Sequence, residues 1–373
     1  MNTVKWRQNA ALLFHFLPHT GAGTYWKFVE AFGALEPVLF RGDAEPLLSR
    51  LEVESASLLR QYLEHGDNSE LGQRILRGLE IADRGGYQFL CTGEPDYPDL
   101  LAQIHRPPSI LWWRGASETL SLPQIAIVGS RSPSAGGRDN ARRFAAALAG
   151  AGFAITSGLA LGVDAEAHRG ALEAKGPTIA VLGSALDQVY PRRNIGLAEQ
   201  IVDAGGTLLS EFPPGTAALA KNFPQRNRII SGLSLGTLVV EAATRSGSLI
   251  TARCALRQNR EVFAIPGSIH NPMARGCHQL IQSGAKLVES TADIVEELGP
   301  LLGLKHELLV GAENEARLDE GEAILMQALG YDPVNLEQLV ERTGFSVADV
   351  LSKITAMELK GLVEDSGDGY LRV

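Results

Sequence analysis

The chain has 373 residues, 45% of them apolar and 21% charged, which is typical of a globular protein with two or three domains. Its formal net charge of −9 does not exclude a polyanionic ligand, because residues 306–373 hold 14 acidic and 5 basic residues and account for the whole excess. Residues 122–298 hold 17 basic and 14 acidic residues, so this part of the chain can bind a polyanion.

The three cysteines, Cys91, Cys254 and Cys277, are far apart and form no CxxC motif. They indicate neither a disulfide framework nor a zinc ribbon, and a reducing cytoplasm fits them. The apolar stretch ALLFHFL is short and interrupted by His15, so we interpret it as a buried helix and not as a signal peptide. The sequence has no longer apolar run that could cross a membrane. We therefore expect a cytoplasmic protein without a metal site.

Residues 1–83 are predicted to form a small helical domain. Apolar residues recur at helical spacing in four segments, Ala10 to Phe16, Tyr25 to Phe32, Leu47 to Leu63 and Leu71 to Ile81. The turn LPHTGAG is similar to that of a helix-hairpin-helix or SAM-like domain, where backbone amides at a helix N-terminus can hold a phosphate. A helical docking module, whose glycines only make a tight turn, explains the same pattern, and both interpretations stay open.

A Pro-rich connector from Cys91 to Gln124 contains the string ILWWRG, with Trp112 and Trp113 side by side. Tryptophans next to a basic region suggest stacking against nucleic-acid bases. Adjacent side chains of a strand face opposite ways, so at most one of the two can reach a ligand. Core packing is the expected role of the other.

Residues 84–299 are predicted to form an α/β domain built on an extended Rossmann-like, doubly wound parallel sheet. Apolar, β-branched segments alternate with helical patterns of about 8–15 residues, which is the βαβ arrangement. The predicted strands are Ile125–Gly129, Phe153–Ser157, Thr178–Gly183, Thr207–Ser210, Thr237–Val240, Glu261–Pro266 and Lys286–Val288.

The acidic C-terminal part reads as a linker over residues 300–318 and a winged helix over residues 319–373. Two helices meet at Thr343-Gly344, a third begins at Ser346, and a hairpin follows with Gly367–Gly369 at its tip. The third helix has two lysines, Lys353 and Lys360, and two acidic residues. Because a helix that reads duplex DNA carries more basic and amide side chains, we expect this domain to contact protein.

The string FPQRNRIISGLS places Arg226 and Arg228 around Asn227, shortly after Lys221. No carboxylate occurs between Ala217 and Thr237. Arginine offers a planar fork of donors that matches phosphate oxygens, so this cluster predicts an anion site.

Three further strings, IAIVGSR, ITSGLALGVDAEAH and EAATRSGSLITA, each join an apolar run to a turn rich in Gly and Ser. In a parallel sheet such turns gather at the carboxyl edge of the strands, where backbone amides can hold phosphates. We expect them to converge with the arginines on one groove. The predicted groove residues are Gly129, Ser130, Arg131, Ser157, Gly158, Lys221, Asn222, Arg226, Asn227, Arg228, Ser246, Gly247 and Ser248.

Whether Arg226 and Arg228 can bind the same strand depends on where the helix begins. On a regular helix residues i and i+2 point roughly 200° apart, so both can reach one strand of phosphates only if the helix begins near Arg228. Otherwise Arg226 binds together with Lys221, and Arg228 stabilises the fold.

Several neighbouring residues have structural interpretations beside the functional ones. Arg131 either binds phosphate or pairs with a carboxylate at a strand end such as Glu241. Both Glu211 and Glu241 are expected to pair with arginines. Asp164 is expected to cap the helix Ala165–Ala174, and His168 to be a structural histidine because no metal ligand stands at the right spacing.

Together with TIAVLGSALDQVYPRRN and SEFPP, these four strings closely resemble the DprA/Smf family of bacterial DNA-processing proteins. The match spans roughly Cys91 to Leu298, with six motifs in the expected order. The resemblance implies a homodimeric, non-enzymatic protein that binds single-stranded DNA and helps to load the recombinase RecA in natural transformation and recombination.

No cofactor is indicated, because the chain lacks a GxxxxGK[ST] motif and VGSR lacks the second glycine of GxGxxG. One alternative is a nucleotide-binding hydrolase or sensor related to the lysine-decarboxylase-like phosphoribohydrolases. Their PGGxGTxxE motif corresponds to SGLSLGTLVVEA, which lacks PGG and has Glu241 one residue late. A transcription regulator led by the winged helix is disfavoured by the acidity of that domain.

Overall fold

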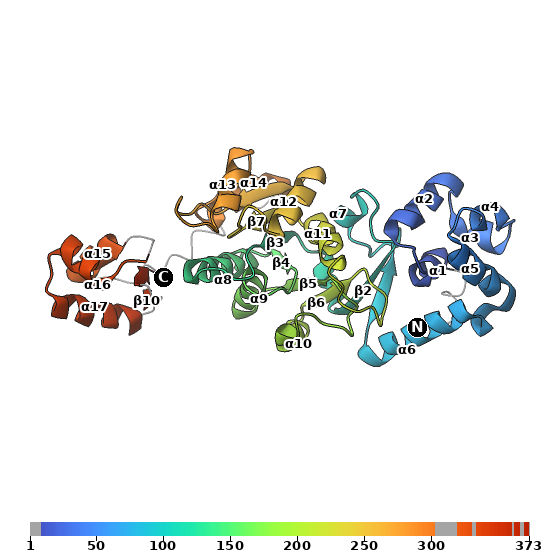
Figure 1. Ribbon diagram of the computed structural model, residues 1–373, viewed down its shortest axis with the longest axis horizontal. Helices are drawn as coiled ribbons and strands as arrows, with labels where there is room; N and C mark the ends of the chain where they lie inside the picture. The colour runs from blue at the N-terminus through green and yellow to red at the C-terminus, as the bar shows by residue number, and fades with distance from the viewer. Residues whose placement is uncertain (1–8, 303–318, 330–332, 360–361, 366–368, 373) are drawn as a thin grey trace.

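The computed structural model describes residues 9–302, 319–329, 333–359, 362–365 and 369–372. Helices from the N-terminal part lie at one end, a large sheet lies in the middle, and a small C-terminal domain lies at the other end (Figure 1). Most of the predicted linker and part of the predicted hairpin tip, residues 303–318 and 366–368, fall outside the described residues. Among the described helices, none combines the length and apolar character of a membrane span.

The N-terminal helical region is confirmed. Its helices are α1 (Ala10–Phe16), α2 (Ala22–Phe32), α3 (Leu35–Phe40), α4 (Glu45–Leu48), α5 (Val53–His65) and α6 (Glu70–Gly85). Helix α3 was not predicted, and the helix expected from Leu47 to Leu63 is interrupted between α4 and α5. The short-range bonds from Arg50 N to Leu47 O and from Leu51 N to Leu48 O turn the chain there. Helical spacing of leucines therefore did not distinguish a turn from a continuous helix.

The helical region and the sheet share one hydrophobic core. Trp112 Nε1 donates to His15 Nε2 at 2.9 Å, and Trp26 Nε1 donates to the carbonyl of Pro107 at 2.6 Å. Burial lowers the pKa of His15 to about 3, so the ring is neutral and can accept the indole proton. These bonds hold the helices in one position against the sheet.

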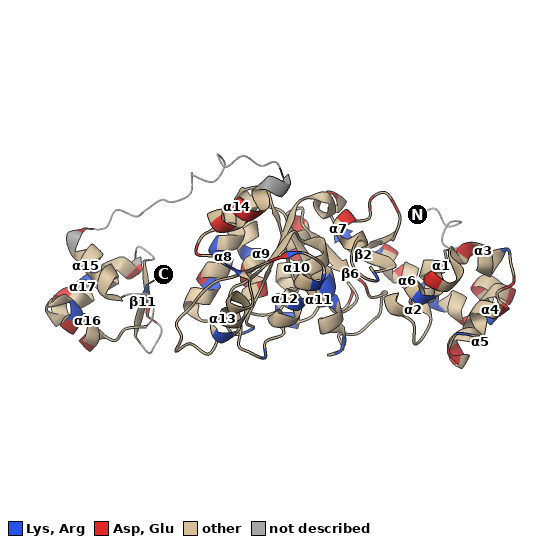
Figure 2. Ribbon diagram, turned by 90° about the horizontal axis from the view of Figure 1, so that it is seen from above, with Lys and Arg blue, Asp and Glu red and all other residues tan. Residues whose placement is uncertain are grey.

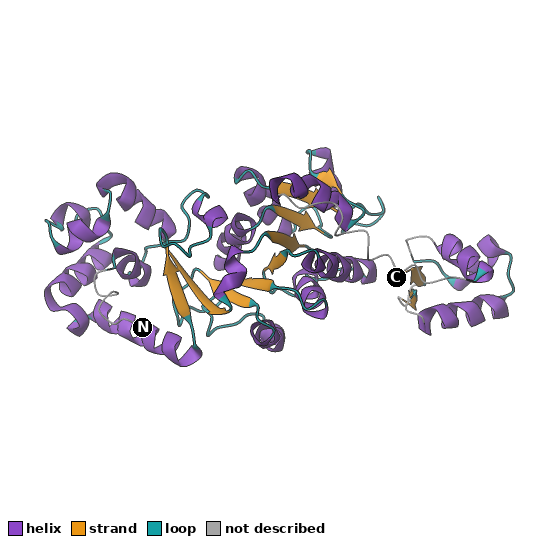
Figure 3. Cartoon of the chain, turned by 180° about the vertical axis from the view of Figure 1, so that it is seen from behind, coloured by secondary structure: helices purple, strands orange, loops and turns teal. Residues whose placement is uncertain are grey.

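The central sheet has nine strands in the order β1-β2-β6-β5-β4-β3-β7-β8-β9. They are β1 (Gln88–Cys91), β2 (Ile110–Gly115), β3 (Gln124–Val128), β4 (Ala154–Ser157), β5 (Thr178–Leu182), β6 (Thr207–Ser210), β7 (Gly236–Val239), β8 (Glu261–Ala264) and β9 (Lys286–Leu287). The strands β3 to β9 pair in parallel, and β1 and β2 extend the sheet antiparallel (Figure 3). The predicted strands and fold class are confirmed, with ends shifted by at most two residues.

Helices cover both faces of this sheet, as expected of a doubly wound fold. From β3, Ile125 and Ile127 pack toward α8 (Ala135–Gly150) and α9 (Val163–Glu173), and Val128 packs toward α11 (Asn222–Leu233) and α12 (Ser248–Arg257). The remaining helices of this domain are α7 (Asp99–Ala102), α10 (Ile195–Asp203), α13 (Arg275–Gln282) and α14 (Thr291–Leu302). The strand order reverses between β3 and β7, so the loops after these strands diverge and leave a crevice there.

Trp112 and Trp113 both belong to the core. Trp112 is 1% exposed and packs beneath the N-terminal helices, while Trp113 is 8% exposed and packs on the other face of the sheet. The opposite orientations follow the predicted alternation. The suggested stacking role is wrong for both, because β2 is covered on its two faces.

The C-terminal domain is a winged helix, as predicted. Helices α15 (Glu320–Leu329), α16 (Leu336–Thr343) and α17 (Val347–Leu359) precede the antiparallel strands β10 (Val363–Asp365) and β11 (Tyr370–Arg372). Gly344 ends α16 in the left-handed conformation at φ 70°, which explains the Thr343-Gly344 turn. Lys353 of α17 pairs with Asp319 at 3.3 Å, and Lys360 lies outside the described residues.

His168 is fully buried between α9 and β5, with Nδ1 2.7 Å from Thr178 Oγ1. The structural role predicted for it is confirmed. Burial, with help from the positive charges of Arg226 and Arg169, lowers the pKa of His168 to about 3. Its neutral form is therefore favoured in the folded protein.

We predict that His168 makes the domain less stable as the pH falls. Its pKa is about 6.5 in the unfolded chain and about 3 in the folded one, so unfolding takes up a proton between these values. Between pH 7.5 and 5.5 this single group should lower the free energy of unfolding by about 1.4 kcal/mol. Urea unfolding followed by tryptophan fluorescence should show a smaller loss in His168→Gln than in wild type. The exposed control His270→Gln should lose as much as wild type, and equal losses in all three would contradict the assignment.

Candidate functional site

A cleft of about 830 Å³ opens at the carboxyl ends of β3 and β7, where the strand order reverses. We call it the switch-point cleft. Of the predicted groove residues, those that line it are Gly129, Ser130, Arg131, Arg226, Asn227, Ser246, Gly247 and Ser248. The convergence of two Gly/Ser turns with part of the arginine cluster is therefore observed.

Arg131 lies exposed at the wall of this cleft, and the described part of the chain offers it no hydrogen bond or ion pair. The turn beneath it is held by Ser130, whose Oγ accepts the backbone N–H of Ser132 at 3.0 Å. Gly129 is required by close packing, since an added Cβ would lie 2.7 Å from Val163 Cγ2. The turn is therefore rigid while its cationic side chain is free.

Glu241 is not the partner of Arg131. Its carboxylate accepts the backbone N–H of Ser134 at 3.0 Å and the hydroxyl of Ser134 at 2.6 Å, and Ser134 caps α8. The prediction that Glu241 pairs with an arginine is wrong, because the carboxylate is hydrogen-bonded to Ser134, the N-cap residue of α8. The prediction for Glu211 is confirmed, because Arg228 donates to it.

Arg226 lies at the floor of the cleft and is only 4% exposed. Its Nη1 donates to the carbonyl of Gly158 at 2.6 Å and also to the carbonyl of Val181. A Cβ on Gly158 would lie 2.5 Å from Arg226 Nη2, so glycine is needed there. Ser157 and Gly158 do not line the cleft as predicted, because Ser157 is buried and donates to Ile127 O at 2.6 Å. Gly158 instead accepts a hydrogen bond from Arg226 beneath the cleft.

Asp164 also serves this buried arginine. It does not cap α9 as predicted, because Gly162 holds the cap position. Its carboxylate accepts the backbone N–H of Gly158 at 3.1 Å and that of Ala160 at 3.4 Å. Burial raises the pKa of Asp164, and the positive charge of Arg226 opposes this shift. The floor of the cleft thus contains a buried carboxylate, Asp164, and a buried guanidinium, Arg226, and each favours the charged form of the other.

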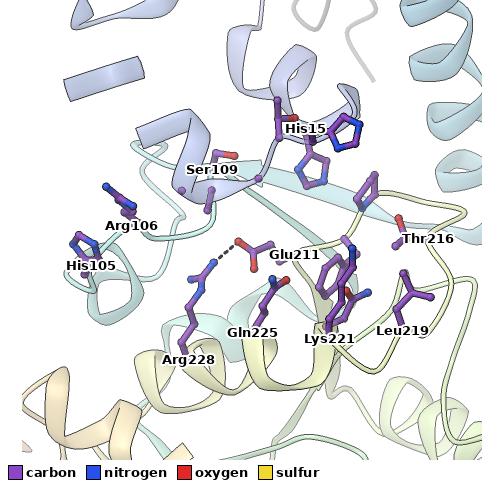
Figure 4. Close-up of a pocket in the computed structure, with 18 residues that line it drawn as sticks. His15, His105, Arg106, Ser109, Glu211, Thr216, Leu219, Lys221, Gln225 and Arg228 are labelled. Carbon is purple, nitrogen blue, oxygen red and sulfur yellow. Dashed lines mark hydrogen bonds and ion pairs between the residues drawn. The ribbon is translucent and has the colours of Figure 1, made fainter. Parts of the chain in front are cut away.

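Helix α11 begins at Asn222, so Arg226 and Arg228 point in different directions. Arg226 faces the switch-point cleft, whereas Arg228 pairs with Glu211 on another side of the helix. Lys221, Asn222 and Arg228 line a second cavity of about 700 Å³, between α11 and the N-terminal helices (Figure 4). We call it the junction pocket. The expected single groove is therefore divided by α11, and Lys221 does not share a pocket with Arg226.

The switch-point cleft also contains an aromatic pair that was not predicted from the sequence. The ring centroids of Tyr190 and Phe223 lie 5.5 Å apart, and Tyr190 is 51% exposed. The exposed Arg245 lines the cleft as well. Tyr190 comes from the quoted string VYPRRN, but no local pattern indicates that it meets the start of α11. Within the described ranges, no cluster of three or more His, Cys, Asp or Glu could hold a metal ion.

The fold and the cleft together define an extended Rossmann-like protein with an open, arginine-lined site at its switch point. The chain belongs to the DprA/Smf family of DNA processing proteins. Residues 88–299 match the family described as DNA recombination-mediator protein A, and residues 312–369 match the DprA winged helix domain.

Curated relatives and solved structures agree with this membership. The chain is 44% identical over 283 residues to Protein Smf of Escherichia coli, covering 74% of this chain and 75% of the relative. It is 38% identical over 275 residues to DNA processing protein DprA of Bacillus subtilis, covering 74% and 88%. The X-ray structure of DprA from Streptococcus pneumoniae matches with a TM-score of 0.61 and 34% identity, over 78% of this chain and 97% of that one. DprA from Helicobacter pylori, whose structure describes a single-stranded DNA binding mode, matches with a TM-score of 0.52 and 29% identity, over 57% and 96%.

We predict that Arg226 contributes strongly to stability. In Arg226→Ala the carbonyls of Gly158 and Val181 lose their donor, and the buried carboxylate of Asp164 loses the nearby positive charge. Together these losses should cost about 3 kcal/mol. Urea unfolding of the variant measures this loss. The exposed Arg131→Ala is the matched control and should unfold within about 0.5 kcal/mol of wild type. If Arg226→Ala were as stable as wild type, its hydrogen bonds would not support the cleft.

Proposed function

We propose that the switch-point cleft binds single-stranded DNA. The observation that carries this proposal is that the unpaired guanidinium of Arg131 and the half-exposed ring of Tyr190 line one open cleft. A single strand presents phosphates, which attract the cation, and unpaired bases, which stack on aromatic rings. The description of the Helicobacter pylori relative as a binder of single-stranded DNA supports the same ligand.

The contacts would be made mainly with the sugar-phosphate backbone. Besides Arg131, the cleft offers Asn227, the exposed Arg245 and the turn Ser246 to Ser248 at the N-terminus of α12. Backbone amides at a helix N-terminus and hydroxyl groups bind phosphate oxygens without reading the base. We therefore propose binding with little base preference.

The bound strand would be protected and presented to the recombinase RecA in natural transformation and recombination, with the protein acting as a homodimer. Family membership supports these roles. The winged helix would contact protein instead of duplex DNA, because the described third helix offers Lys353 only as the ion-pair partner of Asp319.

We predict salt-sensitive binding to single strands, measured by fluorescence anisotropy of labelled oligothymidylate. The slope of log K against log salt should be about −0.7 for each phosphate neutralised. Arg131→Ala should weaken binding about tenfold or more, since a charge-assisted hydrogen bond is worth roughly 1.5–3 kcal/mol. Arg257→Ala removes the same charge from the last turn of α12, away from the cleft, and should bind as wild type. Tighter binding to duplex DNA, or equal losses in both variants, would contradict the proposal.

We further propose that the protein is not a nucleotide hydrolase, although its sheet could hold a nucleotide. Glu241, the carboxylate of the string that corresponds to the hydrolase motif, already accepts two hydrogen bonds from Ser134, the N-cap of α8. A carboxylate held in this way is poorly placed to transfer protons to a substrate.

The expected result is therefore no release of free base from nucleoside monophosphates and no hydrolysis of ATP, measured by chromatography of the products. Glu241→Gln serves as the control for any trace activity in the preparation. Base release by wild type that disappears in Glu241→Gln would favour the hydrolase alternative.

A further inference from the structure

The junction pocket lies outside the switch-point cleft and is built from four parts of the chain. Its walls come from the turn between α1 and α2, from the loop around Arg106 in the connector, from the loop after β6, and from the start of α11 (Figure 4). The shared core and the bonds of Trp26 and Trp112 hold these parts together. The pocket is therefore a fixed feature of the fold.

The charges in this pocket are mostly positive. Its lining includes three basic residues, Arg106, Lys221 and Arg228. Among the described residues that line it, Glu211 is the one carboxylate, and it is already paired with Arg228. Arg106 and Lys221 have no acidic partner in the described ranges of the chain. The other titratable groups are histidines, His15, His19 and His105. The pocket thus has an excess of positive charge that favours an anion.

Hydrogen-bond donors at the same walls lack acceptors. Asn222 is 3% exposed, and its Nδ2 has no partner among the described residues. The same holds for Nε of Arg106 and Nη1 of Arg228. Buried donors are usually paired, so three unpaired donors around one cationic cavity indicate a ligand with several acceptor oxygens.

The turn between α1 and α2 adds backbone donors. Helix α2 begins in the pocket wall at Ala22, and its cap residue Gly21 makes no side-chain cap. The first amides of an uncapped helix point toward an anion placed at its N-terminus. The sequence left open whether this glycine turn holds a phosphate or only makes a tight bend, and its position opposite Arg106 and Asn222 favours the phosphate.

We propose that the junction pocket binds a phosphate of the same single strand that occupies the switch-point cleft, with the strand crossing the first turns of α11. This inference rests on the proposed function. Asn227 of α11 lines the cleft and Asn222 lines the pocket, and a helix with side chains is only about 10–12 Å wide, so a few nucleotides would join the two sites. A free nucleotide or inorganic phosphate offers the same oxygens, and the experiment separates these sources.

The test compares oligothymidylates of about 6 and about 30 nucleotides, since one binding module covers roughly 4–16 nucleotides. Fluorescence anisotropy is recorded with the full chain and with the variants Arg106→Gln and Gln225→Glu. Gln225 is an exposed pocket residue, so its replacement places a negative charge there without disturbing the core. Arg41→Gln removes an exposed arginine of the same helical region outside the pocket and is the matched control. Thermal melting shows that each variant is folded.

We expect both pocket variants to weaken binding of the long strand about fivefold or more and to leave binding of the short strand unchanged. In Arg106→Gln the salt slope for the long strand should become shallower by about 0.7, which is one phosphate. Arg41→Gln should match wild type. Long-strand affinity that is unchanged in both pocket variants would overturn the proposal.

Competition with thymidine monophosphate and inorganic phosphate tests the other sources. If either ligand binds wild type, loses affinity in Arg106→Gln, and leaves long-strand binding unaffected, the pocket serves a free anion and the proposal is wrong. If Arg131→Ala does not weaken binding of the short strand, the proposed function of the cleft is wrong. If the pocket variants lose affinity for the long strand alone, the second site is supported.

Discussion

The arrangement of the site depends on the buried guanidinium of Arg226. By donating to the carbonyls of Gly158 and Val181, it ties α11 to the turn after β4 and to strand β5 itself. This contact also fixes the rotation of α11 about its axis. Once Arg226 points inward, the 100° step between helical residues sends Arg228 toward Glu211 and the junction pocket. The sequence suggested that Arg226 contacts the ligand, but in the structure its main role is to fix the position of α11 and of the other residues of the site.

Electrostatics follow the domain organisation more than the total charge. The chain is acidic as a whole, yet its net charge of −9 comes from residues 306–373. The arginines that line the switch-point cleft lie on α11, where basic residues gather in Figure 2, and in the loops after β3 and β7. The carboxylates near this edge of the sheet already have local partners: Asp164 accepts from backbone amides close to Arg226, and Glu241 accepts from Ser134, the N-cap of α8. What remains free is cationic. Such a division lets an acidic protein offer a polyanion site.

The N-terminal helices form part of the site because they share a core with the sheet. Trp112 extends beneath them from β2 and is bonded to His15, so the helical region cannot be treated as an independent appendage. This continuity creates the junction pocket, in which the glycine turn before α2 faces the start of α11. Domains that share a buried core keep a fixed spacing, and a ligand that spans them meets a rigid surface.

The sequence by itself determined the strands, their parallel order and the turns after them, because hydrophobic periodicity and Gly/Ser turn signals act over a few residues. It also placed Arg131, Ser246 and Gly247 at one edge of the sheet, since the carboxyl ends of parallel strands must meet there. Tertiary structure alone decided which partners those residues find. Ser134 is hydrogen-bonded to Glu241, and the ring of Tyr190 packs near that of Phe223, 33 residues further along the chain. The two arginines of α11 point to different sides of the helix. These outcomes depend on the rotation of helices and on contacts between distant segments, which no local pattern encodes.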